Sequence, residues 1–136
     1  MKIVEILRIA MLGSIVLFVL VGEIAARTLV VAPASELYFA ITLVAIVVVV
    51  MISVVRRWFV LKAEATLAVQ PADAAALARR SAGYIVTYAM CEAVALFGLV
   101  LRLNGFTLSQ VAPFYAIGLV LMLFFAPHRP LNEVGR

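Results

Sequence analysis

Long runs of apolar residues, separated by short polar segments, dominate the pattern along the chain. The runs cover about residues 9–29, 36–60, 83–103 and 111–126. A helix needs about 20 residues to cross the hydrocarbon core of a bilayer, and each run is close to that length. Because backbone groups in lipid must be bonded within their own segment, each run is expected to be a helix. The pattern therefore predicts an all-α polytopic membrane protein with four transmembrane helices.

Start signals refine the expected helices. Gln70-Pro71-Ala72-Asp73 is typical of a helix start, with proline at the first helical position and an acid in the first turn. Segment 62–68 consists mostly of good helix formers and should extend the second helix beyond the bilayer. Thr107 with Gln110 matches a capping box at the start of the fourth helix. An extended cytoplasmic helical hairpin is therefore expected between the second and third helices. The expected helices are 3–30, 35–68, 72–103 and 109–126, in a single domain, 1–136, with a tail, 127–136.

The composition excludes most other classes of protein. Hydrophobic residues make up 67% of the 136 positions and charged residues only 13%, whereas soluble domains are about half apolar and a quarter charged. A soluble domain of this size could not bury so much apolar surface. A soluble enzyme, a nucleic-acid binder and a disordered chain are therefore excluded. With one cysteine and one histidine, no internal disulfide, metal site or cofactor is expected.

The basic residues are distributed unequally between the two sides of the predicted membrane. The chain has 11 Lys and Arg residues, and only Arg27 and Arg102 fall on one of the two sides. The positive-inside rule then places both termini and the 62–80 connection in the cytoplasm. The strength of this asymmetry favours a bacterial inner membrane. Glu5 and Glu23 argue against a cleaved signal peptide in the first apolar run.

Glu92 is the candidate functional residue, because it lies in the middle of the third apolar run. An ionised side chain there costs several kcal/mol, so the carboxyl is expected to be neutral. Its side chain leans toward Tyr88, four residues earlier, and Thr42 on a facing helix is the second candidate partner. Two interpretations follow. Glu92 either binds a proton or cation, or joins two helices through a hydrogen bond.

A second pair of charges lies near the outer end of the first helix. Glu23 and Arg27 have the i, i+4 spacing of a local ion pair on a helix. Arg102, at the end of the third helix, can extend its side chain to the same interface. These residues are expected to anchor helix ends rather than to form a functional site.

Two pairs of basic residues lie at the predicted cytoplasmic interface. They are Arg56–Arg57 and Arg79–Arg80. Each charge near an anionic leaflet contributes about 1 kcal/mol of attraction to the surface. These arginines are expected either to contact lipid headgroups or only to set the topology.

One segment resembles a known family. Gln70-Pro71, followed by Cys91-Glu92-Ala93-Val94-Ala95-Leu96-Phe97-Gly98-Leu99-Val100, is similar to part of the proteolipid (c) subunit of rotary ATP synthases. That family has a Gln-Pro loop followed by a helix with the ion-binding carboxylate. The resemblance implies that Glu92 would be the ion carrier. It covers less than a quarter of the chain, and segment 36–60 lacks the glycines of the preceding helix in that family.

The motifs of enzymes are absent from the sequence. It contains no Gly-rich phosphate loop, HExxH or CxxC. We therefore expect a non-enzymatic accessory or assembly subunit of a membrane complex, or alternatively a proton- or cation-coupled transporter or channel protomer that uses Glu92. The expected partners are the lipid bilayer and either further copies of the chain or other membrane subunits, without nucleic acid. The third helix carries small residues that would let another helix approach closely. They are Gly83, Ala89, Ala93 and Gly98.

Overall fold

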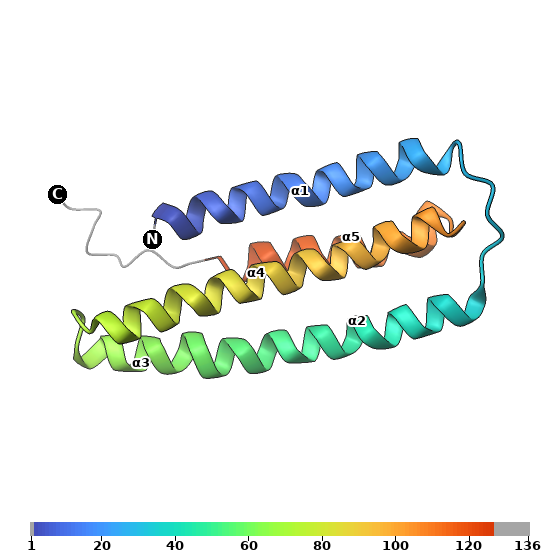
Figure 1. Ribbon diagram of the computed structural model, residues 1–136. Coiled ribbons are helices and arrows are strands. Elements are labelled where there is room, and N and C mark those ends of the chain that lie inside the picture. The colour runs from blue at the N-terminus through green and yellow to red at the C-terminus, as the bar shows by residue number, and fades with distance from the viewer. Residues whose placement is uncertain (1, 127–136) are drawn as a thin grey trace.

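The computed structural model describes residues 2–126, and every regular element in this part of the chain is helical (Figure 1). The elements are α1 (Lys2–Ala26), α2 (Ser35–Val55), the π-helix η1 (Arg56–Leu61), α3 (Lys62–Val69), α4 (Ala74–Leu103) and α5 (Leu108–Phe124). The predicted all-α class is confirmed. The expected tail, 127–136, lies outside the described residues.

Three helices are long and apolar enough to cross a membrane. They are Lys2–Ala26, Ser35–Val69 and Ala74–Leu103, the second of which joins α2, η1 and α3 into one continuous rod. The fourth expected span, α5, has 17 residues and a length of about 25 Å, at the lower limit for a spanning helix. The protein therefore has the helices of a membrane protein, and α5 is the shortest of its apolar rods.

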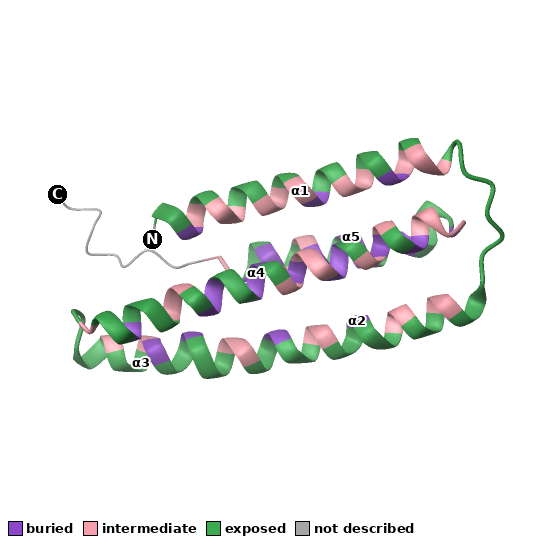
Figure 2. Ribbon diagram, viewed as in Figure 1, coloured by how far each residue is buried: buried purple, intermediate pink, exposed green. Residues whose placement is uncertain are grey.

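α4 forms the centre of the fold. It packs against each of the other helices, and α1 and α2 lie on opposite sides of it (Figure 1). Figure 2 shows buried positions concentrated on α4, whereas α1 and α2 are mostly exposed. The largest fully buried side chains include Tyr84, Tyr88 and Leu101 of α4. The broad apolar faces of α1 and α2 are therefore available to lipid or to other helices.

The two halves of α4 have different neighbours. Near its start, Gly83 lies against the rod formed by α2, η1 and α3, where an added Cβ would approach Val60 Cγ2 to 2.7 Å. Further along, α5 packs closely on α4, and an added Cβ at Gly118 would approach the Cys91 carbonyl oxygen to 2.7 Å. The first half of α4 thus forms a helical hairpin with α3 that extends past the end of α5.

The α3–α4 connection is as short as the sequence predicts. Only residues 70–73 interrupt the helices between 62 and 80. The predicted start of the helix at 72 is wrong, because Asp73 is the N-cap: its carboxylate accepts hydrogen bonds from the N–H groups of Ala75 and Ala76. An aspartate preceding α4 in extended conformation is a better cap than an acid within the first turn.

The helix ends differ modestly from the expected ones elsewhere. α1 ends at Ala26 instead of residue 30, where the Thr28 hydroxyl donates to the Ala25 carbonyl and an extended link to α2 follows. Gly105, in the α4–α5 loop, lies against this link with a φ of +90° that other residues rarely adopt. The predicted capping box is present: the N–H of Thr107 donates to Gln110 Oε1 at 3.0 Å.

Candidate functional site

Glu92 lies on the face of α4 that meets α1. The Ser14 hydroxyl donates a hydrogen bond of 2.5 Å to Glu92 Oε1, and the contact is partly buried. Ser14 and the neighbouring Gly13 form a pair of small residues near the middle of α1. The contact therefore joins α1 to α4 through the carboxyl that the sequence singles out.

The two partners expected for Glu92 are wrong. The Tyr88 hydroxyl donates instead to the Phe125 carbonyl oxygen at 3.0 Å, at the end of α5. Helical side chains lean toward the N-terminus, which carries the Tyr88 ring away from Glu92. The Thr42 hydroxyl donates to the Tyr38 carbonyl of its own helix at 2.7 Å. Thr42 is on α2, and α2 lies on the other side of α4 from α1 (Figure 1).

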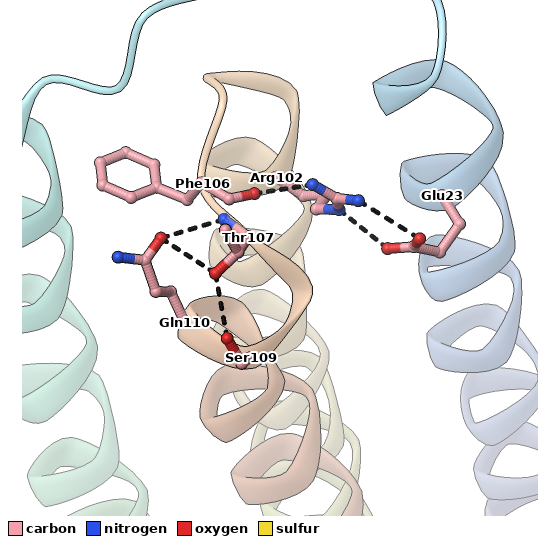
Figure 3. Close-up of polar contacts among 6 residues, drawn as sticks. All are labelled: Glu23, Arg102, Phe106, Thr107, Ser109 and Gln110. Carbon is pink, nitrogen blue, oxygen red and sulfur yellow. Dashed lines mark hydrogen bonds and ion pairs between the residues drawn. The ribbon is translucent and has the colours of Figure 1, made fainter.

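The local ion pair expected between Glu23 and Arg27 is also replaced by one between helices, and Arg27 lies just beyond the end of α1. Glu23 pairs with Arg102 of α4: the distance from Arg102 Nε to Glu23 Oε1 is 2.8 Å, and Nη2 is 3.3 Å from Oε2 (Figure 3). Arg102 Nη1 also donates to the Phe106 carbonyl at 2.8 Å. A planar guanidinium suits this two-point contact with a carboxylate. Arg102 is therefore held by α1, and the ion-pair partner of Glu23 is Arg102 rather than Arg27.

The two polar contacts between α1 and α4 join residues with nearly the same separation along the chain. Ser14 and Glu92 are 78 residues apart in the chain, and Glu23 and Arg102 are 79 apart. A nearly constant offset requires the two helices to run in the same direction, as Figure 1 shows. The contacts are separated by about 14 Å along α1 at 1.5 Å per residue. Two separated polar contacts therefore fix both the rotation and the translation of α1 on α4.

Basic side chains gather at the opposite end of the bundle from Arg102. The guanidinium carbon of Arg56 lies 4.3 Å from the centre of the Phe125 ring. Arg80 Nε lies 3.5 Å from Glu64 Oε1. Arg57 and Arg79 are exposed. Of the four arginines expected at lipid headgroups, two thus contact other side chains of the bundle and two face outward.

The rod of α2 and η1 contacts α5 and its C-cap residue at two places and is separated from α5 between them. At one end, the Tyr38 hydroxyl donates to the Gln110 carbonyl at 3.2 Å, and its ring packs edge-on against Phe114. At the other end, Arg56 covers Phe125. Between these contacts lies a groove of about 420 Å³, lined almost wholly by apolar atoms.

Within the described residues, no group of three His, Cys, Asp or Glu side chains could hold a metal ion. Cys91 is buried and unpaired. Comparisons with family models, with curated proteins and with solved structures found no match to this chain. The resemblance to the ATP synthase proteolipid therefore stays a likeness of one segment.

Sequence reasoning missed Ser14 and the pairing of Arg102 with Glu23. A signal for Ser14 exists, because it is a hydroxyl in the middle of the first apolar run. Spacing along one helix could not identify these contacts, since both depend on which face of α4 receives α1. The observed contacts can hold α1 against α4. The Glu92 carboxyl, which lies inside the apolar part of α4, can also carry a proton.

Proposed function

We propose that the chain crosses a bacterial inner membrane four times, with both termini and the α3–α4 hairpin in the cytoplasm. The described basic residues support this orientation, because seven of them cluster toward one end of the bundle, leaving Arg27 and Arg102 at the other. The seven are Lys2, Arg8, Arg56, Arg57, Lys62, Arg79 and Arg80. The positive-inside rule assigns the richer end to the cytoplasm.

The proposed role is that of a non-enzymatic accessory or assembly subunit that packs against itself or a larger membrane complex. The supporting observation is how the polar groups of α1 and α4 are used. Glu92 and Glu23 both bond within the chain, to Ser14 and Arg102. They stabilise a preformed bundle, while the outer faces of α1 and α2 stay apolar and open to partner helices.

Photo-cross-linking tests the accessory role. A photoreactive residue replaces Leu17 on α1 or Val47 on α2, both 55% exposed, in cells that make the protein at natural levels. A discrete cross-linked product with a second copy or another membrane protein is expected. The same residue at Ile52, which is fully buried, is the control and should give none. Adducts to lipid alone from both exposed positions would contradict the role.

The second candidate function is proton or cation transfer by Glu92. It is favoured by the partial exposure of Glu92, whose carboxyl lies at the contact between α1 and α4 and is not enclosed in the buried core. Glu92→Gln separates the two functions, because the amide keeps the hydrogen bond and cannot release a proton. An accessory role predicts that Gln keeps the cross-linked complex. An ion-carrying role predicts that reconstituted vesicles lose proton or cation flux while the complex persists.

A further inference from the structure

Two arginines at the end of the bundle that is rich in basic residues have buried nitrogen atoms that no acceptor satisfies. Arg8 Nε on α1 and Arg56 Nη1 on η1 are buried and have no hydrogen-bond partner among residues 2–126. At the other end of the bundle, by contrast, Arg102 is bonded to the Glu23 carboxylate. Because a buried donor without an acceptor is destabilising, Arg8 and Arg56 indicate an acceptor supplied by another molecule.

Arg8 lies on the face of α1 that packs into the bundle. Val4, one turn earlier on the same face, is only 2% exposed. The offset of 78 residues between contacting positions of α1 and α4 places Arg8 level with residue 86 of α4. This level is between Tyr84 and Tyr88, the two largest fully buried side chains of the protein. Arg8 is therefore directed toward the interior at the basic end, not toward lipid.

Arg56 reaches the same level from the other side of α4. Its guanidinium carbon lies 4.3 Å from the centre of the ring of Phe125, the C-cap residue of α5. The carbonyl oxygen of Phe125 already accepts a hydrogen bond from the Tyr88 hydroxyl. The charges of Arg8 and Arg56 both act on that hydroxyl. The two guanidinium groups therefore gather around the point where α5 ends against Tyr88.

The depth of this point in the membrane favours a phosphate group as the acceptor. α5 has 17 residues and a length of about 25 Å, whereas the hydrocarbon core is about 30 Å thick. The end of α5 is therefore close to the boundary between hydrocarbon and headgroups, where the phosphates of lipids lie. Guanidinium groups donate several parallel hydrogen bonds to phosphate oxygens, so one phosphate can satisfy donors from two arginines.

We propose that Arg8 and Arg56 together bind one phosphate group at the end of α5. The phosphate belongs either to the headgroup of an anionic lipid or to a soluble phosphate compound that enters from the basic side. This inference rests on the membrane location proposed above, but not on the orientation or on the accessory role. A chain without a membrane location would not enter nanodiscs at all, whereas a chain without the phosphate site would enter them and show no lipid preference.

Native mass spectrometry of the full chain, released from nanodiscs of phosphatidylglycerol and phosphatidylcholine in equal amounts, tests the site. Arg8→Gln and Arg56→Gln each remove one inward guanidinium. Arg57→Gln and Arg79→Gln remove exposed charges at the same end and are the matched controls. High salt screens attraction to exposed charges more than to partly buried ones. In a second arm, thermal unfolding of the lipid-free chain in neutral detergent is measured with and without inorganic phosphate.

The natural chain is expected to retain one phosphatidylglycerol in preference to phosphatidylcholine. Arg8→Gln and Arg56→Gln should each lower that preference about fivefold, the effect of one basic residue at an anionic surface. At high salt, the two control variants should change it by less than about twofold. Arg56→Lys keeps the charge and should keep most of the preference, which distinguishes loss of the site from misfolding.

The second arm identifies the source of the phosphate. Inorganic phosphate that raises the unfolding temperature of the natural chain, but not of Arg8→Gln, would support the site with a soluble compound as its ligand. Lipid preference without an effect of inorganic phosphate would support the site with a lipid headgroup as its ligand. A lipid preference and an unfolding temperature that Arg8→Gln and Arg56→Gln leave unchanged would overturn the proposal, as would equally large losses in Arg57→Gln and Arg79→Gln.

Discussion

The hydrogen bond between Ser14 and Glu92 makes a specific energetic prediction. Hydrogen bonds between membrane helices contribute about 0.6 kcal/mol on average and up to about 2 kcal/mol. The oxygen–oxygen distance of 2.5 Å is at the short end of the range for O–H···O bonds. We therefore expect a value toward the upper limit, about 1.5 kcal/mol, which is close to a tenfold change in an equilibrium constant.

A double-mutant cycle measures this contact. Ser14→Ala removes the donor, Glu92→Leu removes the acceptor, and the double variant removes both. Reversible unfolding in mixed micelles of mild and denaturing detergent gives the free energy of unfolding of each form. The coupling energy between the two positions should be about 1.5 kcal/mol. Additivity within about 0.5 kcal/mol, as expected for independent sites, would refute the contact.

The same cycle with Thr42→Val in place of Ser14→Ala provides the control. The Thr42 hydroxyl bonds to the Tyr38 carbonyl within α2, so its loss should not depend on the residue at position 92. Additive effects are expected. Coupling between Thr42 and Glu92, together with additivity between Ser14 and Glu92, would identify Thr42 as the partner of Glu92. It would contradict the position of the Glu92 side chain against α1.

Three further predictions test other contacts. Neutralising either Glu23 or Arg102 should lower the free energy of unfolding by about 1–2 kcal/mol, between the values of surface and buried pairs. Exchanging the two residues should restore most of the lost stability. An exchange variant no more stable than the single variants would contradict the ion pair. Gly118→Ala should cost about 1–3 kcal/mol because its Cβ would overlap α4, whereas Gly13→Ala, with no atom within 4 Å, should be neutral or stabilising; equal losses would contradict the packing. A cysteine in place of exposed Ala75 should react with an impermeant thiol reagent only from the cytoplasmic side. Labelling of this cysteine from outside intact cells would contradict the proposed topology.

The helices themselves could largely be predicted from the sequence. Runs such as 36–60 are too apolar for any other environment, and the Thr107–Gln110 pair identifies the start of α5 correctly. The ends of the helices are harder to predict from the sequence, because neighbouring residues compete to cap them. Asp73 lies close to Pro71, and only the backbone conformation determines that the aspartate caps α4 from outside the helix.

The contacts of Glu92 and Glu23 could not be predicted from the sequence, and the reason is geometric. Spacing along one helix tells which residues share a face, so it favours local partners such as Tyr88 for Glu92 and Arg27 for Glu23. The observed partners belong to other helices. Which residues become partners depends on the rotation of α1 around α4. The faces of α1 are similarly apolar, so the sequence does not indicate that rotation.

The π-helical turn η1 accommodates one residue more than an α-helical turn, because its hydrogen bonds span five residues instead of four. The buried positions of the rod reflect this: Ala45 and Ile52 are seven residues apart, and Val60 follows Ile52 after eight. Deleting one residue within Arg56–Leu61 should convert the turn to α-helix and keep α3 against α4. The same deletion inside α2 would rotate one part of the helix by about 100° against the other. Changes in the length of this rod are therefore tolerated at η1 and penalised on either side of it.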